Sequence, residues 1–469
     1  MVFSSLIFLF AYLPLTLLCY YTVPRKWRNI VLFVLSLLFY GWGEPIYLLL
    51  MVLSITSAYL FGFLIEKHRH ENPKKAKQAM VLSLAVSLSL LFFFKYYNFF
   101  AQNLSLLPFV EIPTIEGLKL PIGISFYTFQ IMSYTIDLYR NDCELQKSYI
   151  SFGTYVTLFP QLIAGPIVRY RDVDEQLSDR RESMDDFAAG VARFCVGLSK
   201  KVLVGDMLAA GNEYFKASAE LGATTLGAWL TIICFTLHLY YDFSGYSDMA
   251  IGLGKMLGFD FPENFNYPYI ARSITEFWRR WHISLSTWFR EYVYIPLGGN
   301  RKGLKRQFLN LFVVWFLTGF WHGASWNFVL WGLYFCAILI AEKAFLLRFL
   351  ERTPSVLRHI YTMVIVTLGF LIFSFTDAAA GLDCFGALFG VGVVGVSLPS
   401  VTYQLLRSLP LLLIAAVGAT PLPARLWKGL TSRYPRLCLL VPLLCAAALL
   451  LCTAYMVDST FSPFAYTQF

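Results

Sequence analysis

Residues Ser273 to Trp326 read SITEFWRRWHISLSTWFREYVYIPLGGNRKGLKRQFLNLFVVWFLTGFWHGASW, and the rest of the chain is interpreted outward from this stretch. It contains two of the six histidines, His282 and His322, among many tryptophans and arginines. Between Arg272 and Arg306 there are eight Lys or Arg residues and only two acidic residues. The next segment, Gln307 to Trp321, is almost wholly apolar. A basic, aromatic segment is therefore followed by an apolar segment, and His322 lies at the end of the apolar segment.

The composition of the 469-residue chain predicts a polytopic membrane protein. Hydrophobic residues make up 57% of the chain and charged residues only 14%, whereas a soluble domain is about one quarter charged. The apolar residues form runs of about 20, which is long enough to span a bilayer. A soluble helical protein is disfavoured, because many of these runs lack a polar face. We expect an all-α fold with about ten to twelve transmembrane helices, and with re-entrant and interfacial helices besides.

The net charge of +9 indicates cytoplasmic loops and anionic lipid headgroups rather than nucleic acid, because no disordered basic tail accompanies it. The nine cysteines are scattered and lie mostly within apolar runs, where cysteine behaves as a small hydrophobic residue. There is no CxxC motif, so the sequence predicts neither a disulfide framework nor a metal site.

Loop charges predict the orientation of the helices, because basic loops stay in the cytoplasm. Val2–Val23 has no basic segment before it and is expected to be a first transmembrane helix rather than a cleaved signal. Pro24–Arg28 and Glu66–Gln78 are basic and are placed in the cytoplasm. Asn98–Gly117 has two Glu and no Lys or Arg, as expected of an external loop. Ala424–Arg436 is a further basic loop, and together these assignments predict that both termini lie outside.

One internal segment, Ser151–Val168, is interrupted by Pro160, Gly165 and Pro166. A broken or dipping helix is predicted there, and such helices survive in a membrane only where protein covers them. We expect a single membrane-embedded domain over 1–469. Its parts are N-terminal helices (1–118), a catalytic core (119–341), C-terminal helices (342–456) and an external tail (457–469).

His322 ends the apolar run, within GFWHGASW. A titratable side chain at membrane depth is costly and is therefore a candidate functional group. Gly319 and Gly323 remove side-chain bulk around it, which would let a ligand approach closely. An imidazole can take a proton from a hydroxyl or thiol near neutral pH. The alternative, a core histidine bonded to a neighbouring helix, stays open.

His282 lies in WRRWHIS, where a continuous helix would give it the same face as Trp278. That face would line a pocket, while Arg279 and Arg280 on the other side would meet phosphate or headgroups. An interfacial helix rich in Trp and Arg is the alternative for the arginines. The candidates for a donor-binding funnel are Trp278, Arg279, Arg280, Trp281, Arg290, Asn300, Trp321 and Trp326.

Other notable residues are given structural interpretations. Pro296–Gly303 resembles a phosphate loop but lacks GK[ST], so a plain turn is predicted. His238, one helical turn before Asp242, is expected to form a structural hydrogen bond. His68, His70 and His359 are placed in a basic loop or at a membrane edge.

Two long motifs carry a family resemblance: FWRRWHISLSTWFREYVYIPLGGN, starting at Phe277, and GFWHGASWNFVLWG, starting at Gly319. They closely resemble the membrane-bound O-acyltransferases, in the branch of the alginate and peptidoglycan O-acetyltransferase membrane subunits. FPQLIAGPIVRY, YYDFSGYSDMAIGLGKMLGF and the ending FSPFAYTQF are similar to that branch too. The teichoic-acid D-alanyl transfer subunit shares WRRWH, but PLGGN and the additional C-terminal spans favour the acetyltransferase branch.

The resemblance implies that His322 is the essential histidine and His282 the second active-site position. It implies a ring of tilted helices around a thinned centre, where a cytoplasmic funnel meets an external pocket. The implied reaction uses acetyl-CoA as co-substrate, with no bound cofactor, and the acetyl group reaches an extracytoplasmic polysaccharide indirectly. An extracytoplasmic transferase of SGNH type is the implied partner, and the implied location is the bacterial cytoplasmic (inner) membrane.

The aromatic tail contains Tyr466 close to its end, and the phenol of this residue could accept the acetyl group as an ester and pass it to the partner's serine. This hypothesis follows a resemblance to a C-terminal tyrosine motif of related export systems, and an interfacial aromatic anchor is the alternative. Further alternatives for the whole chain are D-alanyl transfer, a non-catalytic scaffold, and a transporter or flippase with the histidines as proton relays. The sequence shows no evident inverted repeat of the kind found in many transporters.

Overall fold

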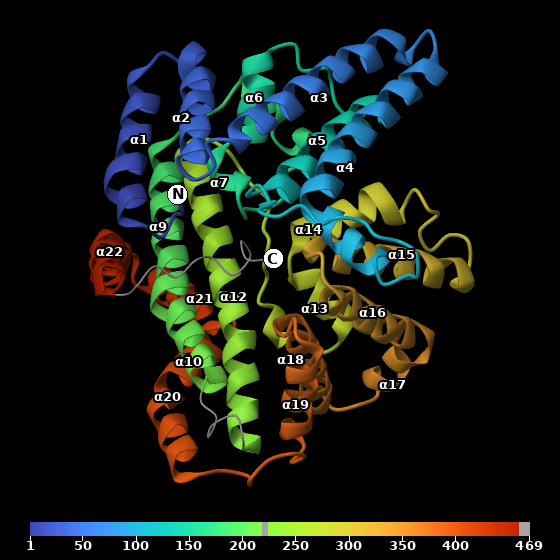
Figure 1. Cartoon of the computed structure of the whole chain (residues 1–469). Coiled ribbons are helices and arrows are strands. Elements are labelled where there is room, and N and C mark those ends of the chain that lie inside the picture. Colours follow the sequence, from blue (N-terminus) through green and yellow to red (C-terminus); the bar gives the residue numbers. More distant parts are fainter. Residues whose placement is uncertain (218–223, 459–469) are drawn as a thin grey trace. The chain divides into compact units, whose positions relative to one another are not determined.

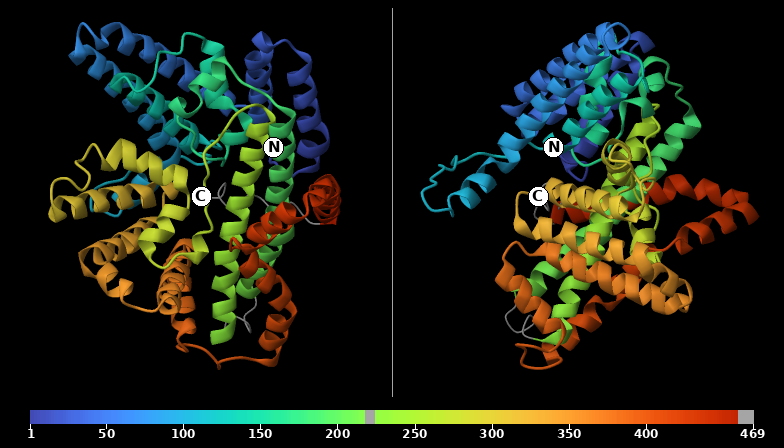
Figure 2. Two further views of the ribbon diagram at one scale, coloured as in Figure 1. Left: turned by 180° about the vertical axis from the view of Figure 1, so that it is seen from behind. Right: turned by 90° about the vertical axis from the view of Figure 1, so that its right-hand side faces the viewer.

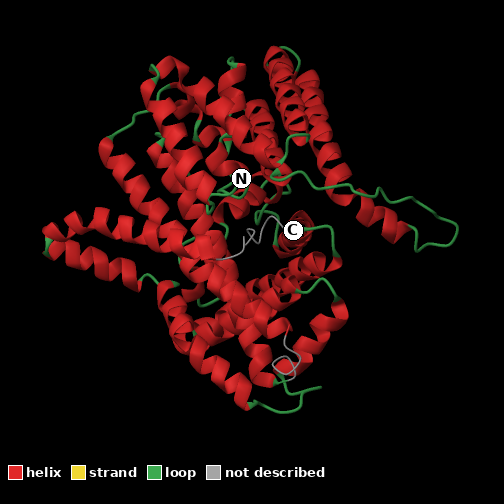
Figure 3. Cartoon of the chain, turned by 60° about the vertical axis from the view of Figure 1, so that its left-hand side comes forward, coloured by secondary structure: helices red, strands yellow, loops and turns green. Residues whose placement is uncertain are grey.

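A computed structural model describes residues 1–217 and 224–458, and its regular elements are helices (Figure 1). Figure 3 shows helices joined by loops over this part of the chain, and Thr224 and Gly395 form an isolated bridge. The all-α expectation is therefore confirmed. Contacts divide the chain into two compact units. The first unit holds residues 1–194 and 246–263, and the second holds the described residues of 195–245 and 264–458.

The first unit contains two long helices and several shorter ones. α3 (Tyr47–Arg69) and α4 (Pro73–Leu104) lie side by side (Figure 1). Asn72 caps α4 by accepting the N–H of Lys75, and Pro73 occupies the first helical turn, where its missing N–H costs nothing. The other helices are α1 (Leu13–Thr22), α2 (Arg28–Gly43), α5 (Ile124–Arg140), α6 (Tyr149–Thr157), α7 (Phe159–Leu162), α8 (Asp174–Ser178) and the start of α9 (Met184–Ser199).

The prediction of a broken helix at Ser151–Val168 is confirmed. α6 ends at Thr157, and α7 is a separate helix of four residues beginning at Phe159. Every residue from 152 to 168 is buried within the protein. The interruption is thus covered by protein, as an irregular backbone at membrane depth requires.

The second unit contains the first part of α12 (Thr225–Met256), up to Gly245, and 78% of the apolar window of this helix is buried. The other helices of this unit lie before and after α12 in the chain. They are α10 (Asp206–Ala217), α13 (Ile274–Arg280), α14 (Ile283–Phe289), α15 (Leu304–His322), α16 (Trp326–Ala341), α17 (Leu347–Glu351), α18 (Ser355–Ser374), α19 (Ala378–Leu388), α20 (Pro399–Gly418), α21 (Leu422–Arg433) and α22 (Val441–Asp458).

Seven helices of the described residues are long and apolar enough to cross a membrane, so the chain is a multi-pass membrane protein. This number is lower than the ten to twelve crossings expected. α2 and α5 have only 16 and 17 residues, short of the roughly 20 that a bilayer needs. One further expectation was wrong: most of the basic segment Ala424–Arg436, predicted as a loop, is helical.

Candidate active site

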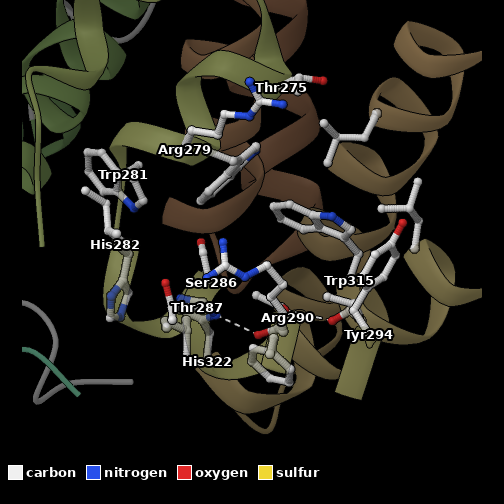
Figure 4. Close-up of a pocket in the computed structure, with 18 of the residues that line it drawn as sticks. Thr275, Arg279, Trp281, His282, Ser286, Thr287, Arg290, Tyr294, Trp315 and His322 are labelled. Carbon is white, nitrogen blue, oxygen red and sulfur yellow. Dashed lines mark hydrogen bonds between the residues drawn. The ribbon is translucent and has the colours of Figure 1, made fainter. Parts of the chain in front are cut away.

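A cavity of about 460 Å³ in the second unit is lined by residues of α13, α14, α15 and the end of α16 (Figure 4). Figure 4 shows the imidazoles of His282 and His322 near each other at one end, with Ser286 and Thr287 beside them. Thr275 and Arg279 lie at the opposite end. Among the candidates from the sequence, Trp278, Arg279, Trp281, His282, Arg290 and His322 line this cavity.

His322 is the last residue of α15 and is 5% exposed. Its Nδ1 lies 2.6 Å from the carbonyl oxygen of Thr318, one helical turn earlier. Because a carbonyl can only accept, Nδ1 carries a proton, and in the neutral ring Nε2 then carries the lone pair. The rings of Trp331 and Phe373 pack edge-on against the imidazole, with centroid distances of 4.8 and 5.7 Å. His322 is therefore held in the tautomer that can accept a proton at Nε2.

His282 lies between α13 and α14 and is held by a side-chain amide. Its Nδ1 lies 3.1 Å from Oδ1 of Asn264. The same oxygen accepts the hydroxyl of Ser284 at 2.9 Å and its backbone N–H at 3.3 Å, so Oδ1 acts as an acceptor and Nδ1 donates. His282 therefore has the same tautomer as His322. Burial, and then the nearby His322, hold the pKa of His282 well below its ordinary value, which keeps the ring neutral.

The expectation that one helix carries both Trp278 and His282 was wrong. α13 ends at Arg280, Trp281 is extended, and His282 has a φ of 44°. A positive φ is uncommon outside glycine and occurs often at functional sites. The chain turns here because the N–H of Ile283 bonds to the carbonyl of Asn264 at 3.0 Å. Both side chains reach the cavity through this turn rather than through a shared helix face.

The sequence suggested that Gly319 and Gly323 make room for a ligand. In the structure, neighbouring residues occupy this space instead. A Cβ on Gly319 would collide with the carbonyl of Phe328 on α16, and one on Gly323 would collide with the Phe328 ring. Gly332 of α16 faces Gly319 in turn, and a Cβ there would lie 3.1 Å from the Gly319 Cα. Gly319 and Gly332 let α15 and α16 touch backbone to backbone, one turn before His322.

Three cations line the cavity: Arg279, Arg290 and Lys343. Lys343 was missed because it forms an ordinary charged pair with Glu342 in the sequence; both lie after α16 in a π-helical turn over Glu342–Leu346. Its neighbour Glu342 is 1% exposed and points the other way. The Glu342 carboxylate accepts the N–H groups of Ile274 and Thr275, each at 2.7 Å. A buried carboxylate thus fixes the N-terminus of α13, where a negative charge is favourable.

The remaining sequence candidates lie elsewhere. Arg280 pairs with Glu276 at 2.9 Å and does not line the cavity. Asn300 is exposed in a turn, and Trp326 is 57% exposed. Trp321 is buried next to both histidine rings, with centroid distances of 6.1 Å to His282 and 5.1 Å to His322. Tyr466 lies outside the described residues.

Two residues of the site, Asn264 and Ser284, were not predicted from the sequence. Asn264 lies 18 positions before the histidine that it orients, in a loop that follows α12. Ser284 belongs to the WRRWHIS motif, but only its hydrogen bond to Asn264 shows what it contributes. Amides and hydroxyls of this kind are recognisable only once the chain is folded, because long-range pairs leave no periodic pattern.

Buried charges also occur away from the cavity, in the ion network of Lys201, Asp206 and Asp242. Lys201 is 1% exposed, pairs with Asp206, and lies 3.2 Å from Asp242. His238 lies near this network, and its Nδ1 is 2.9 Å from the carbonyl oxygen of Gly205. The predicted structural hydrogen bond of His238 is therefore confirmed.

Comparison with known proteins shows the family to which the chain belongs. Residues 34–379 match the model of the membrane-bound O-acyltransferase family. A protein named probable alginate O-acetylase, from Azotobacter vinelandii, is 42% identical over 399 residues, covering 84% of this chain and 79% of its own. The peptidoglycan O-acetyltransferase of Helicobacter pylori is 34% identical over 435 residues, covering 85% and 81%.

A more distant relative is the teichoic acid D-alanyltransferase of Bacillus subtilis, which is 31% identical over 274 residues. This match covers 54% of the chain and 68% of the relative. The family resemblance of the two central motifs is thus confirmed over most of the length of the chain. The chain belongs to the membrane-bound O-acyltransferase family and is a multi-pass membrane O-acyltransferase.

Proposed function

We propose that this O-acyltransferase takes acetyl from cytoplasmic acetyl-CoA and delivers it across a bacterial cytoplasmic membrane for O-acetylation of an extracytoplasmic polysaccharide. One observation carries the proposal: two buried histidines, each with its Nδ1 bonded to a protein acceptor, line a single cavity with three cations. Alginate and peptidoglycan are the polymers named for two relatives. The basic loops orient the chain with both termini outside.

In the proposed reaction His322 acts as general base. Its Nε2 takes the proton of the acceptor hydroxyl while the hydroxyl oxygen attacks the thioester carbonyl carbon. A C–O bond forms, the C–S bond breaks, and the proton passes to the departing thiolate, so His322 returns to its neutral form. His282 lies beside it and, with the same tautomer, offers a second Nε2 lone pair for orienting the acceptor.

The cations would hold the donor. Acetyl-CoA carries its phosphates at the end remote from the thioester, and guanidinium groups suit phosphate geometry. Arg279, Arg290 and Lys343 line the same cavity as the histidines, so one ligand could contact both sets. Arg301 and Lys302, in the exposed turn, would add attraction from solution.

Onward transfer is proposed to use an extracytoplasmic partner of SGNH type. Tyr466 is the proposed carrier, as an acetyl ester on its phenol that the serine of the partner then attacks. Intact mass spectrometry of the C-terminal peptide, in cells that lack the partner, should detect one added acetyl group. An unmodified tail, together with full polymer acetylation by Tyr466→Phe, would remove this step from the scheme.

The central test is thiol release from acetyl-CoA by purified protein, with and without an acceptor. Wild-type protein should release CoA and form an ester, and His322→Ala should lose both while staying in the membrane fraction. Full activity of His322→Ala would reject the general base. Lipid or ion flux without any CoA release would instead indicate the transporter alternative. The second candidate function is D-alanyl transfer, which the 31% identity to a D-alanyltransferase favours. A D-alanyl thioester used in place of acetyl-CoA tests it.

A further inference from the structure

The C-terminal part of the chain has an unusual charge distribution. Residues 384–457 contain no Asp or Glu, and their five cations are Arg407, Arg425, Lys428, Arg433 and Arg436. Four of these five lie within a short stretch that includes α21. This segment follows residue 379, where the match to the family model ends. The core reaction of the family therefore does not account for it.

α21 is amphipathic, and its side chains are not covered by the protein. Leu422, Leu426 and Leu430 recur every four residues on one face and are 49%, 58% and 49% exposed. Lys428 lies on the opposite face, Arg425 lies at the edge of the leucine face, and both side chains are exposed. No residue of α21 is buried. A helix with one leucine face and one basic face is typical of helices that lie flat in a membrane interface.

Two candidate spans hold α21 close to the bilayer. It follows α20 after a three-residue connection and is separated from the next span, Pro435–Asp458, by Tyr434 alone. Only 11% and 6% of the apolar windows of these two spans are buried by protein, so they face lipid. Figure 2 shows α21 and α22, in red, projecting from the other helices of the second unit. At about 3.5 Å per residue, such short connections keep α21 at the membrane surface.

We propose that α21 is an anchor for anionic lipid, which lies in the interface with its leucines in the acyl region and its cations on lipid phosphates. Charge complementarity selects the occupant: four exposed cations and no acid face a leaflet that carries negative headgroups. Among the described residues, no acidic side chain pairs with Arg425, Lys428, Arg433 or Arg436, so these charges are available to lipid. Trp427, 38% exposed, has the residue type that favours the headgroup level.

Amide hydrogen exchange of full-length protein in nanodiscs tests the proposal. Nanodiscs of phosphatidylcholine alone are compared with nanodiscs that also contain phosphatidylglycerol. The peptides over 419–437 should exchange about tenfold more slowly with phosphatidylglycerol, and added salt should weaken this protection because it screens exposed charges. Equal exchange in the two lipids would overturn the proposal.

Two variants supply the controls. R425Q/K428Q/R433Q/R436Q should lose the difference between the lipids, whereas R425K/K428R/R433K/R436K keeps the charges and should preserve it. Exchange in α15 and α16 reports on folding and should be the same in all three proteins. Retention of full lipid selectivity by the glutamine variant, with α15 and α16 intact, would also overturn the proposal. None of these measurements involves acyl transfer, so their result does not depend on whether the proposed reaction is correct.

Discussion

The second unit contains two groups of buried ionisable side chains that are built in opposite ways. In the ion network, Lys201 lies against Asp206 and Asp242, so the charges are balanced by protein. At the cavity, His282 and His322 each use Nδ1 to bond a protein acceptor, and their rings line an open volume. Burial of a titratable group is therefore not enough to indicate catalysis. A neutral ring held in one tautomer beside a cavity is the more informative feature.

The largest effect on activity is expected from His322→Ala, which removes the proposed base. General bases contribute about 10²–10⁴-fold, so kcat should fall by that factor. CoA release by purified protein in detergent measures it. His238→Ala is the matched control, because His238 also bonds a backbone carbonyl but is assigned a structural role, and its kcat per folded molecule should be retained. Equal losses of kcat in the two variants would show that the reaction depends no more on the cavity histidine than on the histidine near the ion network.

Asn264→Ala should have the next largest effect. Without Oδ1 the imidazole of His282 loses the acceptor that fixes its tautomer, and removing such supporting partners costs about 10–100-fold. The pH profile of kcat/KM should change as well, because the ring then exchanges between tautomers. Ser284→Ala removes a neighbouring hydrogen bond on the same oxygen and should cost less. An unchanged rate and pH profile in Asn264→Ala would show that His282 needs no fixed tautomer.

The double variant Arg279→Gln with Lys343→Gln tests whether the cations of the cavity bind the acetyl donor. We expect KM for acetyl-CoA to rise about tenfold with kcat largely retained, since lost ground-state binding changes KM alone. Arg280→Gln is the control, because Arg280 bonds Glu276 instead of lining the cavity. A larger rise of KM in Arg280→Gln than in the double variant would place the phosphates elsewhere.

The smallest effect on activity is expected from Lys201→Met, although its effect on stability is large. Removing one partner of a buried ion pair typically costs about 3–5 kcal/mol, because the remaining carboxylates stay buried without their cation. Thermal unfolding should therefore occur at lower temperature, while kcat per folded molecule stays near wild type. Adding Asp242→Asn should recover part of the lost stability. A lost kcat in a variant of unchanged stability would assign the ion network a part in the reaction.

The sequence predicted the main features of the fold from composition and periodicity alone. Runs of apolar residues indicated membrane helices, and the prolines near Pro160 indicated the broken helix that α6 and α7 form. Helix lengths were harder to predict, because a short helix such as α5, with 14 buried residues of 17, is enclosed by protein rather than by lipid. Burial by protein and burial by lipid leave the same signal in composition.

The two histidines of the site were predictable because they lie in dense motifs, whereas their supports were not. Glu342 and Lys343 form an unremarkable charged pair in the sequence, and only the π-helical turn shows that one holds α13 and the other lines the cavity. The helix break at Trp281 was missed for a similar reason. It depends on a backbone bond from Ile283 to the distant Asn264, which a local pattern does not encode.

The glycine contact between α15 and α16 has a consequence for substrate choice. Gly319 follows Thr318, whose carbonyl holds the imidazole of His322, so the direction of the ring depends on how two backbones cross. Such a crossing cannot slide without a clash, so the proposed proton acceptor is fixed in position. Selection among acyl groups of different length then depends on replaceable side chains of the cavity, such as Leu311 and Val314. Related enzymes could therefore change their acyl group by exchanging wall residues while the base stays in place.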